Sequence, residues 1–122
     1  MSTRSNIGIR ERDGSIRVNY CHSDGYPSYN GRILLAHYTD ESAVRALIGL
    51  GDLSFLAPTL DETFAYHRDR GEEWQSAGEF APGEFRLLEE YAYVYDVSDQ
   101  RWLWAAHGME LTPLTPEDVA RE

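Results

Sequence analysis

Alternating apolar and polar positions predict a β-hairpin near the start of the chain. Residues 7–12 and 15–20 flank Asp13-Gly14, a dipeptide typical of two-residue type I′ turns. A loop of that length sets Ile9 opposite Val18 and places the apolar side chains of both strands on one face. The expected buried face holds Ile7, Ile9, Ile16, Val18 and Tyr20, and the expected wet face holds Arg10, Arg12, Arg17 and Asn19.

A second hairpin is predicted from residues 91–97 and 101–106, which flank the turn residues Ser98-Asp99. Its register brings aromatic residues together on one face, where they form a ladder. The expected cross-strand pairs are Tyr95 with Trp102 and Tyr93 with Trp104.

Short segments with helical spacing occur between and after the hairpins. Asp40 is a typical N-cap for a helix over residues 41–50, and Gly51 stands where a left-handed C-terminal glycine is expected. Pro82 can begin a helix that runs to residue 90, and Thr115 can cap a short closing helix. A further helix is expected over residues 31–38. Residues 61–83 show little periodicity apart from a short strand at 64–67.

Together these elements predict an α+β fold, with two or three helices packed on an antiparallel sheet built from the two hairpins. The length of 122 residues fits one domain, and no repeat or linker divides residues 1–122. The longest apolar runs are far shorter than the ~20 residues that a membrane span needs, and no signal peptide is visible. We therefore expect a cytoplasmic protein without a membrane partner.

Charge is distributed unevenly along the chain. There are 21 acidic and 11 basic residues, every base is an arginine, and the formal net charge is −10. Residues 1–60 hold six arginines and six acids, whereas residues 61–122 hold five arginines and fifteen acids. Such a surface repels nucleic-acid phosphates and attracts basic protein surfaces. The pattern predicts no direct nucleic-acid binding and favours a partner protein with a basic surface.

Four stretches of the sequence stand out as a set: STRS at 2–5, YCHSDGYPSYNG at 20–31, LIGLGDLS at 47–54 and RDRGE at 68–72. Together they resemble an uncharacterised family of small proteins encoded mainly by bacteriophages and prophages. Ser23 stands where the family loop has a tryptophan. The resemblance covers residues 2–72 and implies an origin in a mobile element, with action in the host cytoplasm. It assigns no catalytic residue.

Cys21 is the only cysteine, so the sequence excludes an internal disulfide and leaves a thiol available for chemistry. Cys21, His22 and Asp24, with His67 brought in by the fold, would make a small hydrolase or transferase the enzymatic alternative. Neighbouring side chains on a strand point to opposite faces, so His22 is badly placed to take the thiol proton. We therefore predict that Cys21 is not a nucleophile and that the chain has no catalytic residues.

Metal binding would require several ligand-type side chains to meet in space. The available ligands are His22, Asp24, His37, His67, Asp69 and His107. None of their spacings matches a zinc motif such as His-Glu-x-x-His. His37 also suits the last turn of a helix, where the helix dipole favours a cation. We predict neither a metal site nor another cofactor.

A polar loop and two arginines form a candidate ligand site. Arg68 and Arg70 could hold an anionic ligand through paired hydrogen bonds, or could instead pair with neighbouring acids in a surface turn. The loop 20–31 is rich in glycine and tyrosine, and we expect it to be ordered and to pack on the first helix. The candidate ligand residues are Asp24, Tyr26, Tyr29, Arg68 and Arg70.

Acids are concentrated between Asp61 and Glu90, beside aromatic residues of the types enriched at interfaces. The predicted partner-binding residues are Glu72, Glu73, Trp74, Glu79 and Glu84. The favoured function is that of a small, non-enzymatic accessory protein that binds and modulates a host protein. Its sharper versions are an anti-defence inhibitor and a mimic of nucleic-acid phosphates. A homodimer joined through the aromatic face is a further alternative.

Overall fold

A mixed β-sheet forms the centre of the structure, a computed structural model that describes residues 2–120. The strands lie in the order β4-β3-β2-β1-β6-β7-β8, and β5 also pairs with β2. Their bounds are β1 Ser5–Arg10, β2 Ile16–Cys21, β3 Leu53–Phe55, β4 Phe64–Ala65, β5 Gly78–Phe80, β6 Tyr91–Asp96, β7 Arg101–Ala106 and β8 Thr112–Pro113. The helical elements are the π-helical turn η1 Pro27–Gly31, α1 Arg32–His37, α2 Glu41–Ile48, α3 Tyr66–Arg70 and α4 Pro116–Ala120.

The second hairpin has the predicted register. β6 and β7 are antiparallel, with Tyr95 opposite Trp102 and Tyr93 opposite Trp104. Tyr95 meets Trp102 edge to face at a centroid distance of 5.4 Å, whereas Trp104 stacks on Tyr91 at 6.4 Å. The α+β class is confirmed. The sheet is mixed rather than purely antiparallel, because β1 pairs in parallel with β6 and β2 with β3.

The first hairpin forms, but its register differs by one residue from the prediction. Glu11 and Ser15 close a three-residue loop, with the Glu11 N–H 2.8 Å from the Ser15 carbonyl oxygen. Gly14 ends that loop in the left-handed region, at φ 92°. Val18 therefore lies opposite Gly8, and not opposite Ile9. A one-residue slip moves every side chain of one strand to the other face.

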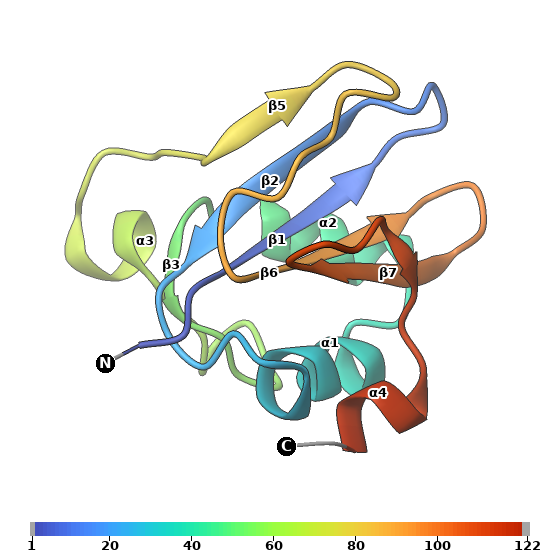
Figure 1. The fold of residues 1–122 in the computed structure, drawn as a ribbon. Coiled ribbons are helices and arrows are strands. Elements are labelled where there is room, and N and C mark those ends of the chain that lie inside the picture. The colour runs from blue at the N-terminus through green and yellow to red at the C-terminus, as the bar shows by residue number, and fades with distance from the viewer. Residues whose placement is uncertain (1, 121–122) are drawn as a thin grey trace.

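The slip gives the sheet an apolar core on each face. Ile7 and Ile9 belong to the larger core under the helices, whereas Ile16 and Val18 belong to a smaller core on the opposite side. In Figure 1, α2 lies behind the sheet, and the orange segment between β5 and β6 crosses in front of it. The smaller core consists of Ile16, Val18, Phe80 and Val94, with Phe85 and Leu111 packed against it.

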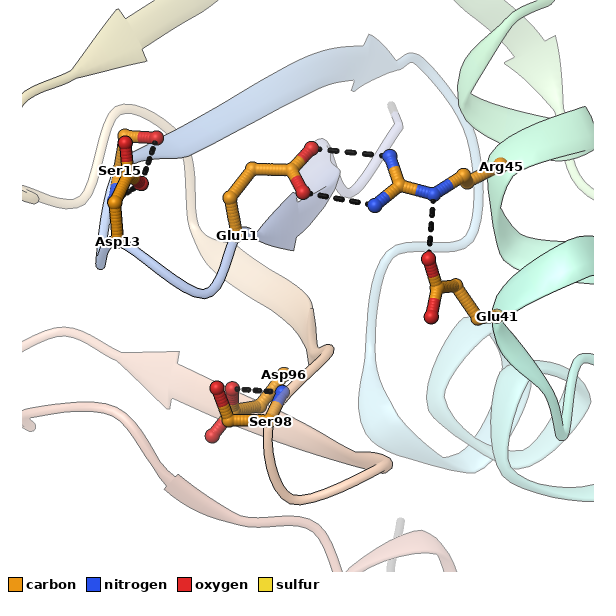
Figure 2. A network of polar contacts seen from close by, with 7 residues as sticks. All are labelled: Glu11, Asp13, Ser15, Glu41, Arg45, Asp96 and Ser98. Carbon is orange, nitrogen blue, oxygen red and sulfur yellow. Dashed lines mark hydrogen bonds and ion pairs between the residues drawn. The ribbon is translucent and has the colours of Figure 1, made fainter.

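α2 is held against the tip of the first hairpin by Arg45. Its guanidinium binds both carboxylate oxygens of Glu11, at 2.8 and 3.0 Å, and Glu41 at 2.9 Å, as Figure 2 shows. The predicted N-cap is present, since the Asp40 carboxylate accepts a hydrogen bond from the Ala43 N–H at 2.8 Å. These contacts fix α2 over the larger core.

Two other residues predicted to mark helix ends have the expected conformation or contacts. Gly51 has the expected left-handed conformation, at φ 78°. Thr115 and Asp118 cap α4 reciprocally, with each side chain accepting a hydrogen bond from the backbone N–H of the other. Of the helices in residues 2–120, none combines the length and the apolar character needed to cross a membrane.

Two local predictions in the second half are wrong. Residues 82–90 form a turn and an irregular segment instead of a helix. Gly83 adopts the left-handed conformation at φ 80°, which breaks a helix immediately after Pro82, and the Glu84 N–H closes a turn on the Ala81 carbonyl. Residues 64–67 divide between β4 and the first turn of α3, instead of forming one strand.

Candidate functional site

A small acidic pocket lies where the chain enters β3 and where α3 runs into the following loop. Its volume is about 90 Å³. Typical small-molecule sites measure roughly 300–1,000 Å³, so this pocket fits one side-chain head group and not a metabolite. The lining residues are Asp52, Tyr66, His67, Glu72, Glu73 and Gln75.

Backbone hydrogen bonds join the three segments that form the acidic pocket. The Asp52 N–H donates to the Gln75 carbonyl at 3.0 Å, and the Tyr66 N–H donates to the Asp52 carbonyl at 3.2 Å. The Glu72 N–H donates to the Tyr66 carbonyl, also at 3.2 Å. Gly71 ends α3 in the left-handed region at φ 70°, which turns the chain back toward β3. The pocket is thus part of the folded framework.

Asp52 is the partly buried acid of the pocket. Its Oδ1 accepts a hydrogen bond from the Tyr20 backbone N–H at 2.9 Å. Burial raises the pKa of the Asp52 carboxyl, and the Tyr20 hydrogen bond opposes that shift. Within residues 2–120, no basic side chain forms an ion pair with Asp52. An external cation would therefore offset the cost of burying this carboxylate.

The two glutamates of the pocket differ in their surroundings. Glu72 forms an ion pair with Arg70 at 2.5 Å, and the Arg70 guanidinium lies 5.3 Å from the centre of the Tyr66 ring. Glu73 is exposed and has no ion pair in the described part of the chain. His67 Nδ1 lies 2.7 Å from the Glu72 carbonyl oxygen, so this nitrogen carries a proton and donates it.

Trp74 lies beside the acidic pocket, because its neighbours in the sequence, Glu73 and Gln75, both line it. At 42% exposure it is the most exposed large hydrophobic side chain in residues 2–120. Its indole N–H donates to the Gly49 carbonyl at 3.0 Å. A Cβ at Gly51 would lie 2.8 Å from the indole nitrogen, so only glycine allows this close approach. The Trp74 ring is therefore held in one position although its surface is exposed.

The predicted partner-binding residues fall in two places. Glu72, Glu73 and Trp74 gather at the acidic pocket. Glu79 lies on β5 opposite Arg17, and Glu84 is exposed in the segment that crosses the other face of the sheet. Asp52 was absent from the predicted set, because it belongs to the electrically neutral first half of the chain.

The thiol of Cys21 is buried between β2 and the loop that follows. It donates weakly to the Ser23 carbonyl at 3.7 Å, and Asn30 Nδ2 lies 3.5 Å from the sulfur. Burial raises the pKa of Cys21 to about 11. His22 Nδ1 instead contacts the Tyr20 hydroxyl at 2.7 Å. The residues of the enzymatic alternative therefore do not assemble a thiolate–imidazole pair.

Most of the other candidate ligand residues bind near neighbours in the sequence. Asp24 accepts a hydrogen bond from the Tyr26 hydroxyl at 3.0 Å, and Tyr29 is exposed in η1. Arg68 binds Asp69 at 2.9 Å. In the part of the chain that the structure describes, no hydrogen bond or ion pair links Arg68 or Arg70 to the loop of residues 20–31. Nor do three or more His, Cys, Asp or Glu side chains of residues 2–120 gather as a metal site would require.

Comparisons of the chain with protein-family models, with curated proteins and with solved structures found no match. The acidic pocket and the tryptophan beside it are accordingly interpreted from their own geometry.

Proposed function

We propose that this protein is a non-enzymatic accessory protein that binds a basic surface of a host protein through the acidic pocket. The observation that carries the proposal is the pocket itself, where Asp52, Glu72 and Glu73 surround a volume of about 90 Å³. A lysine or arginine head group of the partner enters this volume. Its charge is met by Asp52 and Glu73, which form no ion pair within residues 2–120, and by Glu72, which also binds Arg70.

Trp74 gives the interface the specificity and stability that charge alone does not provide. Attraction between net charges speeds encounter but gives little specificity, whereas a buried aromatic side chain at the centre of an interface often dominates its stability. The Gly49 hydrogen bond already restrains the Trp74 ring, so binding orders little additional side-chain freedom. The acidic second half of the chain steers the partner, and the pocket with Trp74 retains it.

The sequence resemblance implies a phage or prophage origin, and that origin supports the proposal of a partner in the host cytoplasm. An anti-defence inhibitor and a mimic of nucleic-acid phosphates are both forms of this function. In the mimic, duplex DNA competes with this protein for the same basic groove of the partner. A homodimer through the aromatic face would instead show binding between copies of the chain.

The test uses two pairs of isosteric substitutions in the immobilised protein, with host lysate as the source of partner. Glu72→Gln with Glu73→Gln removes two charges at the pocket, and Glu79→Gln with Glu84→Gln removes two charges elsewhere. We expect the first pair to abolish capture at about 0.1 M salt and the second to weaken it only slightly, because interactions between exposed charges more than about 10 Å apart are largely screened at that salt concentration.

Capture that persists in about 1 M salt, where the Debye length is about 3 Å, would contradict an electrostatic interface. Equal losses from the two substitution pairs would show that net charge acts without the pocket. Mass spectrometry of the captured protein and competition with duplex DNA then separate phosphate mimicry from simple charge attraction.

A further inference from the structure

A larger cavity lies on the face of the sheet opposite the helices. Its volume is about 480 Å³, within the roughly 300–1,000 Å³ typical of small-molecule sites. Its walls come from the end of the first hairpin, from residues 83–87 and from residues 109–111. It shares no lining residue with the acidic pocket, so its role is independent of the proposed partner site.

Half of the residues that line the cavity are apolar, and the others are glycines or charged residues. Ile16, Phe85 and Leu111 are the residues that it shares with the smaller core or with the side chains packed on that core. Leu87 and Met109 complete the apolar lining, and Met109 remains 38% exposed. The helices cover the other face of the sheet, whereas the segment between β5 and β6, which crosses this face, is irregular (Figure 1). Apolar surface of this kind is suited to an alkyl or aromatic ligand group.

Two arginines line the cavity, and they differ in their partners. Arg10 binds the buried carboxylate of Asp96 at 2.9 Å, which balances its charge. Arg86 lies over the Phe80 ring at 5.7 Å and has no carboxylate partner within residues 2–120. Glu110 also lines the cavity and is likewise unpaired. Arg86 is therefore the lining arginine whose charge remains available to a ligand.

We propose that this cavity binds a small amphipathic anion, with an apolar chain and one carboxylate. The chain packs on Ile16, Phe85 and Met109, and the carboxylate forms paired hydrogen bonds with the guanidinium of Arg86. Arg10 stays paired with Asp96. Glu110 opposes the ligand carboxylate and so limits the affinity.

The experiment compares three eight-carbon probes that differ only in the head group: octanoate, octanol and octylammonium. Each is titrated into the full chain, and NMR shifts of the Leu87, Met109 and Leu111 methyl groups are recorded. We expect saturable shifts with octanoate, with affinity about tenfold higher than for octanol, because hydrogen bonds between a guanidinium and a carboxylate are stronger than those to a neutral hydroxyl. Octylammonium should bind most weakly.

Variants assign that preference to the cavity charges. Arg86→Gln should lower the octanoate affinity about tenfold and leave octanol unchanged. Glu110→Gln should increase the octanoate affinity, and Arg101→Gln, an exposed arginine outside the cavity, should leave it unaltered. Equal binding of octanoate and octanol, equal effects of the two arginine substitutions, or the absence of saturable methyl shifts would each overturn the proposal.

Discussion

The indole N–H of Trp74 donates a hydrogen bond to the backbone carbonyl of Gly49, at a distance of 3.0 Å between nitrogen and oxygen. Through this bond the loop after α3 is attached to the end of α2. We expect Trp74→Ala to raise the dissociation rate of the basic partner by at least about tenfold, with little change in the association rate. Trp74→Phe keeps an aromatic ring but loses the hydrogen bond, so its dissociation rate should lie between those of the wild type and Trp74→Ala. Surface plasmon resonance with both variants checks this, and an unchanged dissociation rate for Trp74→Ala would exclude the anchor role.

Asp52→Asn should increase stability at neutral pH while weakening partner binding. Burial raises the pKa of Asp52 in the folded state, so its ionised form destabilises the fold at pH values above that pKa. Asparagine keeps an oxygen that can accept the Tyr20 N–H. As the pH falls through the raised pKa, the wild-type carboxyl becomes neutral and the advantage of the variant should disappear. Urea unfolding of both proteins between about pH 4 and pH 7 measures this, and a variant that is less stable at pH 7 would refute it.

Alkaline pH should destabilise the fold through buried groups that keep their protons. Burial raises the pKa of Cys21 to about 11 and also raises the pKa of Tyr93. Between the unfolded and folded pKa values the unfolded chain binds fewer protons, so stability falls by up to about 1.4 kcal/mol per pH unit for each group. Cys21→Ala should reduce the slope of stability against pH above about pH 9. Native Cys21 should also react with iodoacetamide far more slowly than in urea, and fast alkylation of the native thiol would contradict its burial.

The contact between Arg45 and Glu11 should contribute modestly to stability. Both side chains are more than a third exposed, so solvent screens the pair even though its geometry is bidentate. A double-mutant cycle with Arg45→Gln and Glu11→Gln should give a coupling energy of about 0.5–1 kcal/mol that shrinks in high salt. The hydrogen bonds from Arg45 lower the pKa of Glu11, so the contribution is present above the usual glutamate pKa and is lost as the pH falls below it. A coupling energy that does not change with salt would argue against an ion pair.

The two hairpins show which parts of the fold can be predicted from local sequence. The register of β6 and β7 follows from their alternation, and the Asp96 carboxylate supports the turn by accepting the Ser98 N–H at 3.1 Å. In the first hairpin, Asp13-Gly14 is compatible with a loop of two residues or of three. The choice depends on distant residues, since Phe80 and Val94 provide the second apolar face for Ile16 and Val18.

The candidate site was predictable only where charge and sequence proximity coincide. Glu72, Glu73 and Trp74 are consecutive and stand out in an acidic segment. Asp52 reaches them through backbone pairing with Gln75 and Tyr66, which no local pattern encodes. The cavity that contains Arg86 depends on residues 82–90 failing to form a helix. Their apolar spacing alone suggested a helix, and the left-handed Gly83 prevents it.

The parallel pairing of β1 with β6 affects how the chain folds while it is being translated. The Arg10–Asp96 ion pair at the end of these strands joins positions 86 residues apart. At a translation rate of roughly 5–20 residues per second, β6 is synthesised roughly 4–17 s after β1. During that interval one long edge of β1 is an open template for pairing with other chains. The centre of the sheet thus forms only after β6 has been synthesised, so the exposure of this edge during translation follows from the strand order and not from the stability of the finished fold.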